Sequence, residues 1–171
     1  MVKPVFLDFD FSTILSADYT SVKGGFEQPL FKDEGIDLPK SYCFENTKVH
    51  MVWWDRSQID YDDIGHQLGL DLITVSSIMK EPGTVFPLHR DNFNNPLWDQ
   101  TRIDQLVRVL ICLEDCKIGH IIQYIEDGKC RTRANWVAGD GFMWDSQVPH
   151  LTVNAGMQPK YTMQITGFLN K

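Results

Sequence analysis

Three residues in the second half of the chain carry side chains that bind metal ions. His89 and Asp91 are separated by one residue, and His150 follows 61 residues after His89, directly behind Pro149. On an extended strand, residues two positions apart point to the same side, so one metal ion could take both His89 and Asp91 as ligands. A second strand beginning near His150 would bring another imidazole beside them. The spacing therefore predicts a metal site made of two imidazoles and one carboxylate.

This donor set indicates a particular metal chemistry. Two imidazoles and one carboxylate on one side of a metal form the facial triad of non-haem iron(II) oxygenases, which leaves positions open for co-substrate and dioxygen. The alternative is structural: His89 and Asp91 would be loop residues after Pro87, with Asp91 capping a turn. A histidine two residues before an aspartate is common by chance, so the surroundings of the motif must decide.

The elements that would position these residues are short strands. From Leu72 onward the chain is rich in β-branched and aromatic residues, divided by turn signals such as Glu126-Asp127-Gly128-Lys129. Many short strands at close spacing favour an antiparallel sandwich or barrel. The predicted strands cover residues 72–79, 84–89, 106–113, 120–125, 130–137, 142–144, 148–153 and 161–168.

The first 70 residues have a different pattern. Glycine and proline interrupt the first 50 residues, Val49–Trp54 is predicted to be an aromatic-rich strand, and Ser57–Leu70 to be a helix with Ser57 as its N-cap. We therefore expect one domain over residues 1–171. In it, an N-terminal helical supporting region (1–70) packs on the outside of a β-barrel core (71–169).

Composition limits the possible partners. The chain has 171 residues, 43% of them hydrophobic, and a formal net charge of −7, as expected for a packed domain that does not bind nucleic acid. Lys129, Arg131 and Arg133 form the one dense basic cluster and would share a face of a strand. They are either a solvated face or a contact for an acidic ligand.

The sequence shows no cysteine motif for zinc, no signal peptide and no membrane-spanning segment. The four cysteines form no CxxC pair and no zinc-ribbon spacing. Residues 1–11 include charged side chains and lack the apolar segment of a secretory signal peptide. No run of 18 apolar residues could form a membrane-spanning helix. We therefore expect a cytoplasmic protein without a membrane partner.

The stretch from Leu72 to Gly167 resembles a known family. The resemblance rests on the His89-Arg90-Asp91 motif, on His150 following a Gly-Asp turn, and on a basic residue, Lys160, ten positions later. These features are similar to the double-stranded β-helix (a jelly-roll or cupin-like barrel) of 2-oxoglutarate and iron(II)-dependent oxygenases. The nearest members are the aspartyl/asparaginyl β-hydroxylase-like branch and small phage or bacterial proteins. The resemblance implies a mainly β fold, with His89, Asp91 and His150 as catalytic iron(II) ligands.

The resemblance also implies a 2-oxoglutarate site on the last strand. Family members usually place an Arg there, with a Ser or Thr two residues later, to hold the distal carboxylate of 2-oxoglutarate. Lys160 and Thr162 stand at those positions. The lysine is a departure, because it offers a point charge where arginine offers a planar fork. The alternative for Lys160 is a surface lysine behind the turn at residues 157–159.

Three further residues are candidates for co-substrate binding. Arg108 lies in a predicted strand of Val, Leu and Ile, where a charge is costly unless it is paired or faces a cavity. It would bind a carboxylate of the co-substrate or substrate, or it would be a charge on an edge strand or form a salt bridge with Glu114 or Asp115. Tyr124 and Ser76 lie on strands that would line the barrel, where they either hydrogen-bond 2-oxoglutarate or pack in the core.

The resulting functional hypothesis is a 2-oxoglutarate/Fe(II)-dependent oxygenase, a hydroxylase acting on a small molecule or a protein or peptide. Two alternatives stay open. One is a cupin-like metalloenzyme, a dioxygenase or isomerase that does not use 2-oxoglutarate. Many cupins have three or four histidine ligands, whereas this chain offers two at suitable positions. The other is a non-catalytic β-barrel binding module, which would have no reason to bring the motif, His150 and Lys160 to one face.

Overall fold

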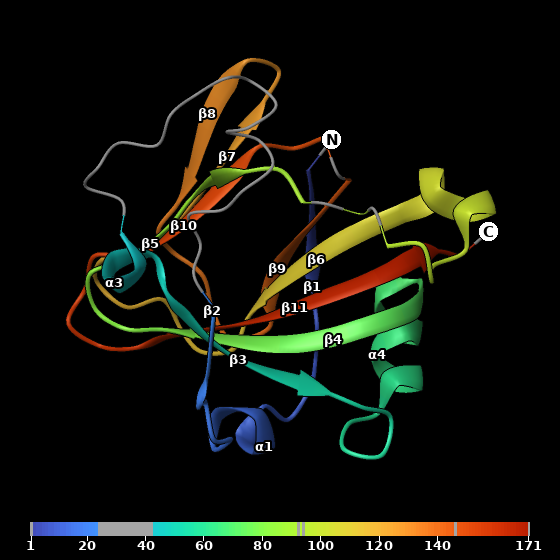
Figure 1. Cartoon of the computed structure of the whole chain (residues 1–171), viewed down its shortest axis with the longest axis horizontal. Helices are drawn as coiled ribbons and strands as arrows, with labels where there is room; N and C mark the ends of the chain where they lie inside the picture. The colour runs from blue at the N-terminus through green and yellow to red at the C-terminus, as the bar shows by residue number, and fades with distance from the viewer. Residues whose placement is uncertain (1, 24–42, 92, 94, 146, 171) are drawn as a thin grey trace.

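Two antiparallel sheets lie face to face and form a double-stranded β-helix, as predicted (Figure 1). The computed structural model describes residues 2–23, 43–91, 93, 95–145 and 147–170. In spatial order, the seven-stranded sheet consists of β1 (Lys3–Phe6), β9 (Asp140–Trp144), β6 (Leu106–Cys112), β11 (Lys160–Leu169), β4 (Leu70–Lys80), β3 (Val49–Trp54) and β2 (Ser21–Lys23). The four-stranded sheet consists of β5 (Thr84–His89), β10 (His150–Asn154), β7 (His120–Glu126) and β8 (Lys129–Arg133).

β11, a central strand of the large sheet, is polar on its inner side and apolar on its outer side. On β11, Thr162 and Thr166 share the face that points toward the small sheet. Met163 and Ile165 point the other way and are fully buried in the main hydrophobic cluster. That cluster covers the outer face of the large sheet with residues from α1 (Ser12–Leu15) and α4 (Tyr61–Leu68). The main apolar cluster therefore lies outside the barrel, while the interior combines polar groups with a second apolar cluster that includes Leu110, Ile122 and Trp144.

Helix α4 is shorter than the sequence predicts. Its N-cap is Asp60, whose carboxylate accepts hydrogen bonds from the backbone of Asp62 and Asp63, so the assignment of Ser57 as the cap is wrong. Ser57 instead bonds the side chain of Asp55 in the preceding turn. The helix ends at Gly69, which has the left-handed conformation that favours glycine (φ 69°).

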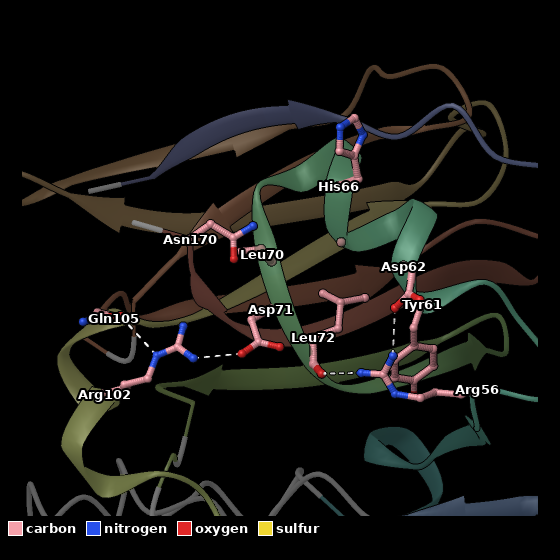
Figure 2. Close-up of a pocket in the computed structure, with 11 residues that line it drawn as sticks. Arg56, Tyr61, Asp62, His66, Leu70, Asp71, Leu72, Arg102, Gln105 and Asn170 are labelled. Atoms are coloured by element: carbon pink, nitrogen blue, oxygen red, sulfur yellow. Dashed lines mark hydrogen bonds and ion pairs between the residues drawn. The ribbon is translucent and has the colours of Figure 1, made fainter.

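Arg56 ties α4 to the large sheet (Figure 2). Its guanidinium lies over the ring of Tyr61, pairs with Asp62 at 3.0 Å and donates to the carbonyl of Leu72. None of the described helices, which include the short α3 (Phe44–Thr47) and the 3₁₀ helix η1 (Gln100–Gln105), is long and apolar enough to cross a membrane.

The supporting region contributes strands as well as helices. Val49–Trp54 is a strand, as predicted, and β2 pairs with it at the edge of the large sheet. β1 pairs with β9 at the opposite edge, although the sequence pattern predicts an irregular start. A four-residue edge strand that contains Pro4 and is mostly exposed has almost no periodic signal, which explains the miss. The prediction for residues 24–42 lies outside the described residues.

Two glycines allow the turn before β7 to touch the turn before β11. Gly119 has φ 88°, and a Cβ atom there would lie 2.3 Å from the backbone nitrogen of Gly156. The carbonyl of Gly119 accepts a hydrogen bond from the backbone of Ala155 at 2.8 Å. This contact fixes the loop that leads into the start of β11, where Lys160 lies.

We expect Gly119→Ala to lower the free energy of unfolding by about 3 kcal/mol or more, because backbone strain and a backbone clash add together. Gly128 is the matched control, since it also has a positive φ (69°) but a Cβ atom there would meet nothing within 4 Å. Gly128→Ala should cost only about 1 kcal/mol. Chemical denaturation of both variants measures the difference, and equal losses would contradict the proposed contact.

Candidate metal centre

His89, Asp91 and His150 come together at one end of the small sheet. Each offers one ligand atom, and the three atoms all lie within 4.8 Å of one another. β5 and β10 are antiparallel neighbours, and their register places His150 opposite His89, with ring centroids 4.2 Å apart. Asp91 follows β5 by two residues. In the described part of the chain, no other group of three His, Cys, Asp or Glu side chains has this geometry.

Both imidazoles are oriented by backbone carbonyls. The Nδ1 atom of His89 lies 2.8 Å from the carbonyl oxygen of Pro87, and that of His150 lies 3.0 Å from the carbonyl oxygen of Val148. Because a carbonyl only accepts, each Nδ1 must carry the proton, and each Nε2 presents a lone pair. Burial lowers the pKa of both imidazoles below the ordinary histidine value, which keeps them neutral near pH 7. Neutral imidazole is the form that binds a metal.

The carboxylate of Asp91 is held by two side chains. The indole of Trp144 donates to Oδ2 at 2.9 Å, and the Nε of Arg108 lies 3.4 Å from Oδ1. Burial opposes ionisation of Asp91, but the Arg108 guanidinium and the two imidazoles outweigh it, so the pKa is below its ordinary value. The site thus offers two neutral imidazoles and one ionised carboxylate, a donor set that fits iron(II).

The three ligands line a cavity of about 190 Å³ between the two sheets. Apolar side chains from both sheets form much of its wall, and the polar groups include Arg108, Lys80, Gln164 and Thr152. A small, partly apolar cavity with a few convergent polar groups is typical of a small-molecule site. Its lining consists of Val49, Met51, Ile78, Lys80, Phe86, His89, Arg90, Asp91, Arg108, Leu110, Trp144, His150, Thr152 and Gln164.

A larger hollow of about 680 Å³ lies outside the barrel, beside α4 (Figure 2). It includes the ion pair between Arg102 and Asp71 at 2.8 Å, with Gln105 and Asn170 nearby. The charges of Arg102 and Asp71 neutralise each other. None of the three metal-ligand candidates lines this hollow. The chemistry is therefore assigned to the smaller cavity.

Lys160 and Thr162 lie on the inner face of the large sheet but do not line the cavity. Lys160 is 1% exposed, so the surface-lysine alternative is wrong. Its ammonium donates to the carbonyls of Ile121 (2.6 Å) and Val153 (3.3 Å) and lies over the ring of Trp136. The role of Lys160 and Thr162 in co-substrate binding stays a prediction.

The other three candidates for co-substrate binding, Arg108, Tyr124 and Ser76, lie in different surroundings. Arg108 lines the cavity, and its carboxylate partner is Asp91 rather than Glu114 or Asp115. Tyr124 is buried against Phe142, opposite His150 in the sheet, and is not part of the lining. The hydroxyl of Ser76 is buried and has no hydrogen-bond partner among the described residues, and the same holds for Thr162. An inward hydroxyl without a partner suits an interior that holds a polar ligand.

Lys80 and Trp144 are site residues that the sequence prediction missed. The predicted strand stopped at Met79, one residue before Lys80, yet Lys80 shares the inner face with Ile78. The signal that could have identified Lys80 is a charged residue in an apolar, β-branched strand. The same kind of signal singled out Arg108. Burial and the nearby Lys160 lower the pKa of Lys80 to about 7. Trp144 could not be assigned, because only the fold shows that it reaches Asp91.

We expect Trp144→Phe to weaken divalent metal binding by about tenfold or more, because Asp91 loses the donor that orients it. Calorimetric titration of the metal-free protein with Mn²⁺ or Co²⁺ measures the effect. Trp53→Phe is the matched control, since Trp53 is 58% exposed on β3. Unchanged affinity in Trp144→Phe would mean that the indole does not support the carboxylate.

The metal-free protein should lose stability as the pH falls below about 6.5, the ordinary pKa of histidine in the unfolded chain. Because the folded-state pKa values of His89 and His150 are lowered, the unfolded chain binds more protons in that range. Denaturation midpoints measured between neutral and acidic pH test this. His150→Gln should be less acid-sensitive than the parent protein, whereas a change at the exposed His66 should leave the sensitivity intact.

Comparison with solved structures shows which proteins share the fold. A prolyl-4-hydroxylase from Pseudomonas putida is 19% identical and matches with a TM-score of 0.53, covering 88% of this chain and 92% of the other. The viral collagen prolyl hydroxylase of Paramecium Bursaria Chlorella virus-1 is 12% identical, with a TM-score of 0.54 and coverage of 91% and 98%. The non-haem α-ketoglutarate-dependent carbocyclase SnoK is 14% identical, with a TM-score of 0.55 and coverage of 82% and 70%.

Comparisons of the sequence with family models and with curated proteins give no match. At identities of 12–19%, the solved structures establish the double-stranded β-helix fold, and the chemistry has to be inferred from the site itself.

Proposed function

We propose that this protein is a 2-oxoglutarate- and iron(II)-dependent oxygenase that hydroxylates its substrate. The observation that carries the proposal is the cluster of His89, Asp91 and His150 inside the barrel, with ligand atoms within 4.8 Å of one another. The shared fold with two prolyl hydroxylases and an α-ketoglutarate-dependent carbocyclase supports it. In the overall reaction, dioxygen gives one oxygen atom to the substrate and one to succinate, while 2-oxoglutarate loses carbon dioxide.

The residues of the chain would bind and orient the reactants. Iron(II) bound by His89, Asp91 and His150 would supply the capacity to react with dioxygen. The backbone carbonyls behind the imidazoles and the indole of Trp144 fix the direction of the ligand atoms before a metal binds. Phe86, Leu110 and their apolar neighbours line the cavity and would limit the access of bulk water, which would protect a reactive centre from side reactions.

The donor set favours this function over a histidine-rich cupin site. His120 is buried elsewhere, with Nε2 3.1 Å from the carbonyl oxygen of Gln158. His50 faces Glu81 and the carbonyl of Tyr19 on the edge of the large sheet. Neither belongs to the metal cluster, so the described residues provide two imidazoles and one carboxylate rather than three or four imidazoles.

The substrate would be a small molecule or a residue of a protein or peptide. Lys129, Arg131 and Arg133 are exposed on β8, where Arg131 lies opposite Tyr124 and Tyr124 lies opposite His150. These basic side chains share the face of the small sheet that carries His150. They are candidates for contacting an acidic group of the substrate.

Aerobic incubation with Fe²⁺ and 2-oxoglutarate should produce succinate, even without a substrate, and His150→Ala should abolish it by removing a metal ligand. His66→Ala on the exposed side of α4 is the matched control and should retain turnover. Succinate is quantified by chromatography, and metal content is measured on the same samples. Full succinate production by His150→Ala would sink the assignment.

A further inference from the structure

Lys80 places a buried positive charge in the metal cavity. The residue is the last one of β4, is 2% exposed and lines the cavity together with His89, Asp91 and His150. Within the ranges that the structure describes, its ammonium lies 5.8 Å from the ring centre of Phe86 and has no carboxylate or carbonyl partner. A buried ammonium without an anion is costly, and burial accordingly lowers the pKa of Lys80 to about 7. An anion bound beside the amino group would favour its charged form.

The other cations near the cavity already have partners. Arg108 faces Asp91 and also donates to the hydroxyl of Thr166. Arg90 donates to the carbonyl of Gln147 at the rim. These contacts leave Lys80 as the cation that lines the cavity without a described partner.

Lys160 differs from Lys80 although the two lie directly opposite each other on β11 and β4. The ammonium of Lys160 donates to two backbone carbonyls of the small sheet, those of Ile121 and Val153. Lys160 therefore links the two sheets and has a structural role. Releasing it to bind a ligand would leave two buried carbonyls without a donor.

We propose that Lys80, rather than Lys160, binds the distal carboxylate of the 2-oxoacid co-substrate. This assignment rests on the proposed function. The triad and Lys80 line the same cavity, so a dicarboxylate could bind the metal with its 2-oxoacid end and Lys80 with its distal carboxylate. A 2-oxoacid without the distal carboxylate has nothing to place against Lys80. The residue is thus a specificity determinant for the co-substrate.

The test compares 2-oxoglutarate with 2-oxopentanoate, which has the same carbon chain but no distal carboxylate. Anaerobic calorimetry on the Fe²⁺-loaded protein gives both dissociation constants without turnover. The parent protein should prefer 2-oxoglutarate by about 10- to 100-fold, the range of a charge-assisted hydrogen bond. The preference should disappear in Lys80→Met and in Lys80→Gln, whereas metal affinity should stay unchanged.

Two further variants complete the design. Lys160→Met should retain the preference but lower the unfolding midpoint, because it leaves the carbonyls of Ile121 and Val153 unpaired. Lys3→Met, on the exposed edge strand β1, is the matched control for loss of a lysine charge and should change neither property.

The outcomes distinguish a failure of the Lys80 assignment from a failure of the proposed function. If the preference is lost in Lys160→Met and kept in both Lys80 variants, the assignment of Lys80 is overturned while the proposed function stands. If the parent protein binds neither 2-oxoacid, the proposed function fails and the assignment of Lys80 fails with it.

Discussion

The antiparallel pairing of β5 with β10 is the constraint on which the site depends. Backbone hydrogen bonds fix which residues face each other, and here they place His150 opposite His89. A slip of one residue would turn one imidazole out of the barrel, because side chains alternate between the faces of a strand. β10 also pairs with β7 on its other side, so this register is fixed by neighbours on both sides. The pairing of the small sheet therefore sets the positions of both imidazoles.

Burial of charge gives the cavity its chemical character. The carboxylate of Asp91 is stabilised by Arg108 and Trp144, and the imidazoles stay neutral because charging them would require burying another cation. Lys80 completes this arrangement as a cation that lacks a described partner. Each of these groups is costly in an apolar interior unless a ligand or a metal compensates it. The cavity therefore contains ionisable groups at a cost in stability, as the proposed metal and anion binding would require.

The main apolar cluster of the protein lies on the outer face of the large sheet. Outer-face residues such as Met163 and Ile165 pack under α1 and α4, and this outer cluster supplies much of the hydrophobic stabilisation. The inner face carries the buried polar residues Ser76, Thr162 and Lys80 beside a second apolar cluster. The buried hydroxyls of Ser76 and Thr162 lack described hydrogen-bond partners, which is a cost in stability that a bound polar ligand would offset.

The sequence by itself determined the β architecture, most strand positions and the three metal-ligand candidates. Those signals are local: the alternation of residues on β11, the turn residues that separate strands, and the spacing of His89 and Asp91. Only the tertiary structure decided which polar side chains reach the cavity. Lys80 and Lys160 are both lysines at strand ends, and their difference arises because Lys160 meets carbonyls of the opposite sheet while Lys80 meets open space beside the triad. Such a difference depends on contacts between segments far apart in the chain, which no local pattern records.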